Sequence, residues 1–375
     1  MADNAGARAD AGASGVLCEV RDSLAIITLN RPAVLNALSL EMIDGLRGTL
    51  RDCAQDLKVR AVMIRGAGGK AFCAGGDIRA LYQSVKSGGT LHHRFFAAEY
   101  PLDYLLYSYP KPFIALLDGI TMGGGMGISQ GSRLRVVSER TRIAMPEVGI
   151  GLFPDVGASY FLSRLPGALG IYLALTGLQI RAADAVYAGL ADFYVPPESM
   201  QLIASRLASL DWTDDAHADV ARALSALATR DLPEAPLSAL RAGIDAHFGE
   251  PSVPAILAAL RRERRPEYAD WAQQTAALIM TRSPTMLSVT LRQMQRGRSM
   301  RLADCLRMEL NMMQQCFAQG DFLEGVRAVI VGKDNSPHWN PSRLQDLGED
   351  AIEAFFKDHW PHGGHPLAHL ERESL

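Results

Sequence analysis

The chain has 375 residues, of which 48% are hydrophobic, so it is long enough for one large domain or two with a full apolar core. Its net charge of −3 at pH 7 and its lack of a dense Lys/Arg run exclude a protein that binds nucleic acid through a basic surface. No apolar stretch reaches the ~18 residues that a membrane span requires, so we expect no membrane association.

The cysteines and the N-terminus bear on the cellular compartment. The five cysteines are odd in number and include no C-x-x-C pair, which favours a reducing compartment over a disulfide framework. Residues 1–15 are rich in Ala and Gly and lack the apolar centre of a signal peptide. We therefore expect a disordered N-terminal tail and a cytoplasmic protein.

The first elements after this tail alternate between strands and helices. Two β-rich runs on either side of residues 21–23 predict a hairpin. Ser39 is expected to cap a helix whose apolar residues repeat at helical spacing. Residues 59–68 read as a strand, and the glycine-rich turn CAGGD at 73–77 leads into a further helix.

The same alternation continues to about residue 140. A helix is expected near residues 92–107, followed by a buried strand in KPFIALLDG at 111–119. The stretch MGGGMG at 122–127 opens a short helix, and RLRVVS at 133–138 reads as another strand. Strands that alternate with helices predict an α/β fold with a mainly parallel sheet and helices packed on it.

From about residue 196 onward the strand signals fade and Ala/Leu/Arg-rich helical segments take over. We therefore expect a core domain over residues 16–200, a helical C-terminal region over 201–345 and a partly ordered tail over 346–375. One apolar stripe at helical spacing predicts a long helix in the second region; its members are Leu302, Leu306, Leu310, Met313 and Phe317.

The two glycine-rich turns are each preceded by a strand and followed by a helix. Glycine lets a ligand approach the backbone closely, and the free N–H groups of a helix start attract negative charge. Two such turns side by side would point two N–H donors at one oxygen, as an oxyanion hole does. Tight packing would explain either turn alone equally well. The glycine spacing in GGGMGISQG does not match the G-x-G-x-x-G pattern of dinucleotide sites.

Two carboxylates stand out in the stretch MPEVGIGLFPDVGAS. Between residues 143 and 163 the only charged side chains are Glu147 and Asp155, in surroundings of apolar residues, glycine and proline. A buried carboxylate is costly unless it is paired or hydrogen-bonded. These two residues therefore either serve the structure, as a cap and an Asx turn, or carry out chemistry.

Several motifs together carry a family likeness. The chain resembles the crotonase (enoyl-CoA hydratase/isomerase) superfamily, and more narrowly its 3-hydroxyisobutyryl-CoA hydrolase branch, over roughly residues 17 to 345. The resemblance implies a crotonase-like ββα spiral core with a helical C-terminal region. The segments that carry it are LNRPAVLNALS, AFCAGGDIRAL, GITMGGGMGIS, AMPEVGIGLFPDVGASYFLSRLPG, LALTGLQIRAADAVYAGLADFYV, SPTMLSVTLRQM and DFLEGVRAVIVGKDNSPHWNP.

The resemblance also implies a division of roles around a thioester. Crotonases bind an acyl-CoA and hold its thioester oxygen with two backbone N–H groups, which here correspond to Gly76 and Gly124. Superfamily members that hydrate double bonds use two glutamates. One corresponds to Glu147, but the other falls at Gly127, and a glycine supplies neither an acid nor a base.

The hydrolase branch keeps the first glutamate and adds an aspartate, which here is Asp155. Glu99, in the EY pair before the buried strand, becomes a candidate to contact the hydroxyl-bearing acyl end of the substrate. Glu147 and Asp155 are the implied catalytic residues. The sequence leaves open whether Glu147 attacks the thioester or activates a water, and how the two carboxylates divide the work.

The function that follows from the resemblance is hydrolysis of 3-hydroxyisobutyryl-CoA, or a similar short 3-hydroxyacyl-CoA, to the free acid and CoA in valine catabolism. An enoyl-CoA hydratase or isomerase and a non-catalytic acyl-CoA-binding protein are the alternatives. We expect no metal and no cofactor beyond the CoA of the substrate. The expected partner is the acyl-CoA thioester, with neither nucleic acid nor membrane, and a homo-oligomer is a further option.

Overall fold

The computed structural model describes residues 14–358, 360 and 364–371. Its larger sheet has the strand order β1-β2-β3-β5-β7-β10. The predicted hairpin is confirmed, because β1 and β2 pair antiparallel, whereas β2 and the following strands pair in parallel. The strands are β1 (Val16–Arg21), β2 (Leu24–Leu29), β3 (Ala61–Gly66), β5 (Phe113–Leu117), β7 (Leu134–Val137) and β10 (Phe193–Tyr194).

Alternation along the strands divides the side chains between two faces of this sheet. In β2, Leu24 and Ile26 join one apolar cluster while Ala25 and Ile27 join the other. The cluster around Leu24 is closed by helices α9 (Ile203–Ala208) and α10 (Ala216–Leu227). Helices α1 (Leu40–Gln55) and α3 (Leu91–Tyr107) contribute to the opposite cluster. Both faces of the sheet are therefore buried, as a mainly parallel sheet requires.

A smaller sheet, not predicted from the sequence, positions the two glycine-rich turns. Its strands are β4 (Ala71–Cys73), β6 (Ile120–Met122), β8 (Arg142–Ala144) and β9 (Ile180–Arg181), in that order. Strands β4 and β6 are parallel neighbours, with Cys73 opposite Thr121. Because parallel neighbours end at the same edge of a sheet, the turns after β4 and β6 emerge side by side.

Short helices follow both turns and complete the core. Asp77 caps α2 (Ile78–Lys86), its side chain accepting a hydrogen bond from Ala80 N, and Ser39 caps α1 as predicted. The remaining helices of the core are α2 (Ile78–Lys86), α4 (Gly124–Gln130), α5 (Ala158–Phe161), α6 (Leu169–Thr176), α7 (Ala182–Ala188) and α8 (Pro197–Met200), with 3₁₀ turns η1 (Pro32–Val34), η2 (Glu147–Gly149) and η3 (Leu162–Arg164).

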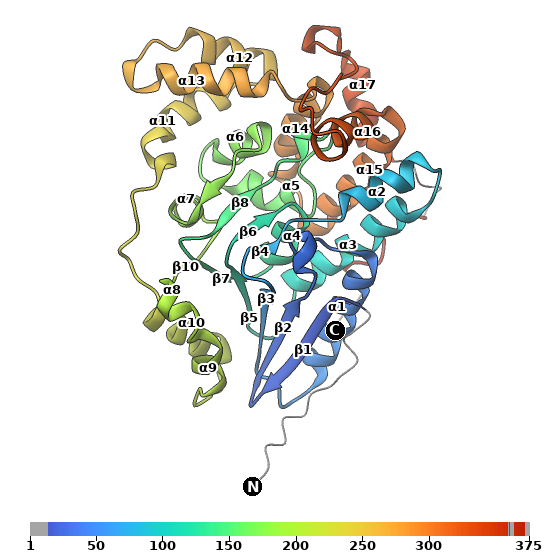
Figure 1. The fold of residues 1–375 in the computed structure, drawn as a ribbon. Coiled ribbons are helices and arrows are strands. Elements are labelled where there is room, and N and C mark those ends of the chain that lie inside the picture. The colour runs from blue at the N-terminus through green and yellow to red at the C-terminus, as the bar shows by residue number, and fades with distance from the viewer. Residues whose placement is uncertain (1–13, 359, 361–363, 372–375) are drawn as a thin grey trace.

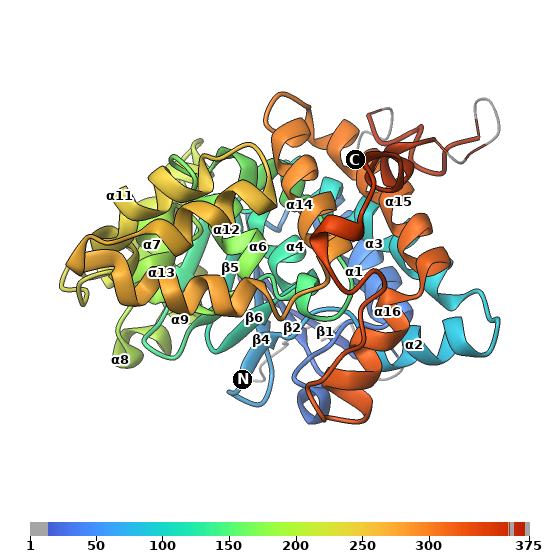
Figure 2. The ribbon, with the colours of Figure 1, turned by 90° about the horizontal axis from the view of Figure 1, so that it is seen from above.

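The C-terminal helices surround the core rather than forming one separate body (Figures 1 and 2). Helices α9 and α10 pack on the large sheet, whereas later helices contact α3, α5 and α6. The predicted boundary at residue 200 thus falls within a shared apolar core. The later helices are α11 (Pro236–Phe248), α12 (Val253–Arg262), α13 (Pro266–Ile279), α14 (Pro284–Gly297), α15 (Leu302–Gln319), α16 (Asp321–Val326) and α17 (Glu349–Glu353), with the π-helical turn η4 (Arg327–Val331) and 3₁₀ turns η5 (Leu344–Asp346) and η6 (Ala354–Phe356).

The structure describes most of the expected C-terminal tail but almost none of the expected N-terminal tail. Residues 1–13 of the expected N-terminal tail lie outside the described residues. Residues 349–356 form helical turns, and Phe355 is buried. Leu367 and Leu370 are also buried in the main apolar cluster. The described part of the expected C-terminal tail therefore packs on the core.

Candidate active site

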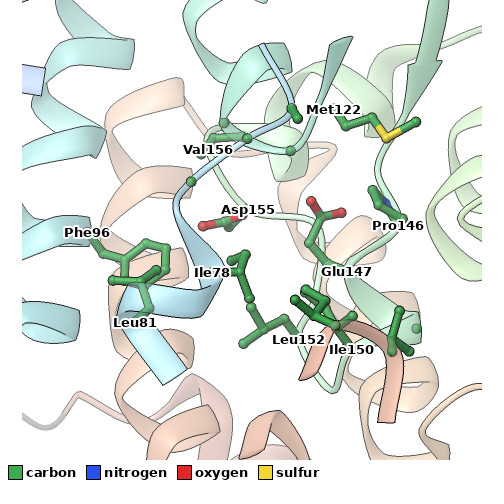
Figure 3. A pocket seen from close by; sticks show the side chains of 18 of the residues that line it. Ile78, Leu81, Phe96, Met122, Pro146, Glu147, Ile150, Leu152, Asp155 and Val156 are labelled. Atoms are coloured by element: carbon green, nitrogen blue, oxygen red, sulfur yellow. The ribbon is translucent and has the colours of Figure 1, made fainter. Parts of the chain in front are cut away.

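A cavity of about 330 Å³ lies where the glycine turns, helix α3 and the loop after β8 meet. Apolar side chains such as Ile78, Leu81 and Phe96 form much of its wall. Figure 3 shows that Glu147 and Asp155 both extend into this pocket. Concave, mainly apolar pockets with a few converging polar groups are typical ligand sites.

Both glycine turns line the pocket with free backbone donors. In the described part of the chain, the N–H groups of Gly76 and Gly124 donate to no other group. Gly124 is the first residue of α4, where the helix itself provides no partner for an N–H. A Cβ built on Gly124 would lie 3.4 Å from the nitrogen of Gly76, which shows how closely the turns approach. This pair of donors can hold an oxygen that gains negative charge.

Glu147 and Asp155 come from the two ends of one loop. Glu147 begins η2 directly after Pro146, and Asp155 precedes the start of α5. Burial raises the pKa of Glu147 well above its ordinary value, and the charge of Asp155 adds to the shift. Burial also raises the pKa of Asp155 to about 7. Two carboxyl groups that share an apolar pocket do not both ionise readily, so the pair retains a proton near neutral pH.

Tyr100 is a member of the site that the sequence did not indicate. Its hydroxyl donates a hydrogen bond of 2.8 Å to Oδ2 of Asp155, and the tyrosine is fully buried in α3. A donor to the ionised form stabilises that form. Tyr100 accordingly opposes the effect of burial on the pKa of Asp155.

Helix α3 brings two further carboxyl groups to the same place. Glu99 lines the pocket, and only 1% of its surface is exposed. Its Oε1 has no hydrogen-bond partner and lies against Gly124, where a Cβ would collide with it. Asp103, one helical turn further on, is buried with both oxygens unpartnered. Burial raises the pKa of both groups, and the neighbouring carboxylates add to it.

The position of Asp103 explains why residue 127 is a glycine. A Cβ built on Gly127 would lie 2.6 Å from Cβ of Val156 and 2.8 Å from Oδ1 of Asp103. Real Cβ atoms essentially never show such short contacts. The space beside position 127 is therefore filled by side chains from α3 and from the loop after Asp155, and it leaves no room for a side chain at this position.

The C-terminal region closes one side of the pocket. Arg282, Ile330 and Asn335 are among the lining residues. Arg282 donates hydrogen bonds to the carbonyl of Thr176, and Arg79 of α2 donates one of 2.7 Å to the carbonyl of Ile330. The pocket is thus complete only when the turn η4 lies against α2.

Helical spacing would have revealed some of the missed residues. Asp103 follows Glu99 by four positions, which places both on one face of α3. Glu309 follows Leu306 by three and precedes Met313 by four, so it interrupts the apolar stripe of α15. A charged residue on a buried stripe indicates a polar partner. The contact between Tyr100 and Asp155 has no such signal, because the two residues are 55 positions apart.

The two-sheet core, with its paired glycine turns beside a buried carboxylate pair, defines a protein of the crotonase fold. Residues 24–356 match the family described as Enoyl-CoA hydratase/isomerase, and the chain belongs to this family. Both the fold and the family predicted from the sequence are thereby confirmed.

Named relatives refine the comparison. The chain is 42% identical to a mitochondrial 3-hydroxyisobutyryl-CoA hydrolase of Rattus norvegicus, covering 91% of this chain and 88% of the relative. It is 38% identical to 3-hydroxyisobutyryl-CoA hydrolase 1 of Arabidopsis thaliana, covering 92% of each. These values support the hydrolase branch that the sequence motifs indicated.

Two solved structures share the fold throughout. A carnitinyl-CoA dehydratase from Mycobacterium thermoresistibile superimposes with a TM-score of 0.84 at 39% identity, covering 92% of this chain and 96% of that one. An enoyl-CoA hydratase from Rhodobacter sphaeroides gives a TM-score of 0.82 at 34% identity, covering 91% and 97%. The names of these two proteins describe addition or loss of water, whereas those of the relatives above describe hydrolysis. The shared fold therefore does not identify the reaction, and the residues of the site must do so.

Two further findings concern metal ligands and membrane-spanning helices among the described residues. None of their groups of three or more His, Cys, Asp and Glu side chains could hold a metal ion. The helices of residues 14–358 include none that is long and apolar enough to cross a membrane.

Proposed function

We propose that this protein hydrolyses the thioester of 3-hydroxyisobutyryl-CoA, or a similar short 3-hydroxyacyl-CoA, as a step of valine catabolism. The observation that carries the proposal is the pair Glu147 and Asp155 in an apolar pocket beside the free N–H groups of Gly76 and Gly124. Hydrolase relatives at about 40% identity over most of the chain support the same reaction.

The oxyanion hole is the first proposed element of the mechanism. The N–H groups of Gly76 and Gly124 would donate hydrogen bonds to the thioester oxygen and stabilise the charge that develops on it during attack. Because these donors belong to the backbone, no side chain is needed for this role. The pocket around them is largely apolar, which strengthens the interaction.

Glu147 is proposed as the principal catalytic residue. In one route its carboxylate attacks the carbonyl carbon, the C–S bond breaks, CoA leaves as a thiol after taking up a proton, and water opens the resulting mixed anhydride. In the other route Glu147 removes a proton from a water that attacks the same carbon, the C–S bond breaks, and the proton passes to the sulfur of the departing CoA. Asp155 shares the proton of the pair with Glu147 and controls the position of Glu147 or the water.

Glu99 is proposed to bind the 3-hydroxyl group of the substrate. Its Oε1 is buried, unpartnered and adjacent to Gly124, so a substrate hydroxyl would supply the missing hydrogen bond. A substrate without this hydroxyl would leave the carboxyl group unsatisfied, at a cost of ~1–3 kcal/mol. The site would therefore select 3-hydroxyacyl thioesters over plain acyl thioesters.

The alternative reactions fit the site less well. Hydration of a double bond uses a second acid/base, and position 127 has neither the side chain nor the space for one. A protein that only binds acyl-CoA would gain nothing from two buried carboxyl groups, each of which costs free energy when it ionises.

One assay separates these functions. The protein is incubated with 3-hydroxyisobutyryl-CoA and, separately, with crotonyl-CoA, while free thiol and the enoyl absorbance are followed. Hydrolysis predicts thiol release from the first substrate and no loss of absorbance from the second. The reverse pattern would identify a hydratase, and binding without either signal would identify a carrier.

The compartment and assembly remain predictions. The names of the animal relatives place those proteins in mitochondria. For this chain we propose a cytoplasmic location, which its odd number of cysteines without a C-x-x-C pair favours. A homo-oligomer is likewise a proposal, and the elution volume of the purified protein with inline light scattering would test it.

A further inference from the structure

The turn that carries Asp155 has an unusual backbone. Val156 and Gly157, the two residues after Asp155, have positive φ angles of 53° and 87°. A β-branched residue is strained in this region, so the surrounding structure must hold the turn in place. Residues 154–159 form little regular structure of their own, because α5 starts only at Ala158 and spans four residues.

A carboxylate from the C-terminal region supplies two of the contacts that hold this turn. Glu309 of α15 is fully buried, and its Oε2 and Oε1 accept hydrogen bonds from the backbone nitrogens of Gly157 (2.8 Å) and Ser159 (2.9 Å). Burial raises the pKa of Glu309 to about 8, while these hydrogen bonds favour its ionised form. One side chain thus binds the backbone directly after the strained residue.

A second buried side chain binds the other end of the same turn. Nε2 of Gln293, in α14, donates to the carbonyl of Pro154 (2.6 Å) and to Oγ of Ser159 (2.8 Å). The carbonyl of Pro154 belongs to the residue directly before Asp155. Asp155 therefore lies between backbone groups held by Gln293 on one side and Glu309 on the other.

We propose that Glu309 and Gln293 are positioning residues that hold the turn 154–159 so that Asp155 faces the pocket. The inference rests on the proposed role of Asp155 in thioester hydrolysis. Neither side chain lines the pocket, so neither is expected to touch the substrate. The helices α14 and α15 of the C-terminal region are then part of the catalytic machinery, although every proposed catalytic group belongs to the core.

The central experiment replaces Glu309 by Gln. This change keeps the shape of the side chain but points an NH₂ group at one of the two backbone N–H donors, which displaces the turn. Because small displacements of a catalytic group cost up to ~10²-fold in rate, we expect kcat for 3-hydroxyisobutyryl-CoA to fall ~10–10²-fold while KM changes less than about threefold. Gln293→Met, which removes the amide donor with little change in size, should show a smaller loss of the same kind.

A matched control separates positioning from general stability. Asp184 of α7 is a buried carboxylate that accepts a hydrogen bond of 2.8 Å from the backbone nitrogen of Leu237 at the start of α11, away from the pocket. Asp184→Asn should lower Tm as much as Glu309→Gln but leave kcat unchanged. Equal losses of kcat in both variants, or an unchanged kcat in Glu309→Gln and Gln293→Met, would overturn the proposal.

A double-mutant cycle tests whether Glu309 acts through Asp155. Single-turnover rates at high enzyme concentration are compared for Asp155→Asn with and without Glu309→Gln. The second change should cost less than about threefold once Asp155 is replaced, whereas independent effects would multiply. The wild-type rate tests the proposed function itself, since an inactive wild type would refute hydrolysis before any variant is compared.

Discussion

The hydroxyl of Tyr100 lies 2.8 Å from Oδ2 of Asp155 and donates a hydrogen bond to it inside the protein. The two residues come from α3 and from the turn before α5, so folding alone brings them together. In a site where burial penalises every negative charge, this donor stabilises the ionised form of Asp155. The hydrogen bond therefore helps to set the pH at which the carboxylate pair gives up its proton.

Replacing Tyr100 by Phe should move the pH dependence of hydrolysis. The hydrogen bond lowers the pKa of Asp155, so its loss raises that pKa above about 7. Because the reaction needs an ionised carboxylate, the acid limb of the plot of kcat/KM against pH should shift to higher pH, by up to about one unit. Tyr109→Phe is the control, since its buried hydroxyl donates to the carbonyl of Leu50 instead. An unchanged plot of kcat/KM against pH in Tyr100→Phe would show that Tyr100 does not influence the ionisation of the catalytic carboxyl groups.

Replacing Glu147 by Gln should abolish turnover but keep binding. The amide can neither attack nor accept a proton, so we expect kcat to fall by ~10²–10⁴-fold. KM should change little, because the proposed oxyanion hole consists of backbone groups. Thiol release measures the effect, and Glu139→Gln, at an exposed position, serves as the control. Substantial residual turnover in Glu147→Gln would assign the chemistry to another group.

Isotope incorporation distinguishes the two routes open to Glu147. After several turnovers in water enriched in ¹⁸O, an anhydride route that water opens at the Glu147 carbonyl would leave label in the Glu147 side chain. A general-base route would put label only in the acid product. Mass spectrometry of the peptide that contains Glu147 reads out the result.

Replacing Glu99 by Leu should remove the preference for a hydroxyl group. The wild type is expected to prefer 3-hydroxyisobutyryl-CoA over isobutyryl-CoA, because the buried carboxyl group otherwise lacks a partner. In Glu99→Leu the ratio of the two kcat/KM values should fall ~5–10²-fold, equivalent to ~1–3 kcal/mol. An unchanged ratio would show that another group contacts the hydroxyl.

Adding a side chain at Gly127 should destabilise the protein without creating a hydratase. Gly127→Ala forces a Cβ against Val156 and Asp103, and overpacking of this kind costs ~1–3 kcal/mol. Thermal unfolding would measure the loss, with Gly48→Ala as the control because a Cβ there meets no atom within 4 Å. Gly127→Glu should lose more stability and remain inactive on crotonyl-CoA. Hydration by that variant would contradict our account of the position.

Replacing Asp155 by Asn should stabilise the protein more at high pH than at low pH. The pKa of Asp155 rises from its ordinary value of 3.8 to about 7 on folding, so the folded state binds the proton more tightly. The resulting stability is fully present below pH ~4 and is lost as pH rises through ~7. The free energy of unfolding of Asp155→Asn, measured relative to that of the wild type, should therefore increase by on the order of 2–4 kcal/mol from pH 4 to pH 8. Urea unfolding at both pH values measures this difference, and a constant difference would argue against a raised pKa.

Much of the local structure was predictable because it depends on neighbours in sequence. The hairpin, the helix after Ser39 and the apolar stripe from Leu302 are set by alternation, capping and helical spacing, and all three are confirmed. The smaller sheet was not predicted as a separate unit. Its strands have only two or three residues each, too few for a periodic pattern, and their pairing joins distant parts of the chain.

The sequence by itself determined the α/β class, the two glycine turns and the candidates Glu147 and Asp155, while its family resemblance implied that Gly127 stands where hydrating crotonases have a second glutamate. These are properties of residue type and spacing, which the chain carries before it folds. Only the tertiary structure decided that Tyr100 contacts Asp155, that Asp103 fills the space beside Gly127, and that Glu309 and Gln293 hold the turn of Asp155. These contacts join residues as far as 152 positions apart, and no local pattern encodes them, because only the packing of helices against the core brings such residues together.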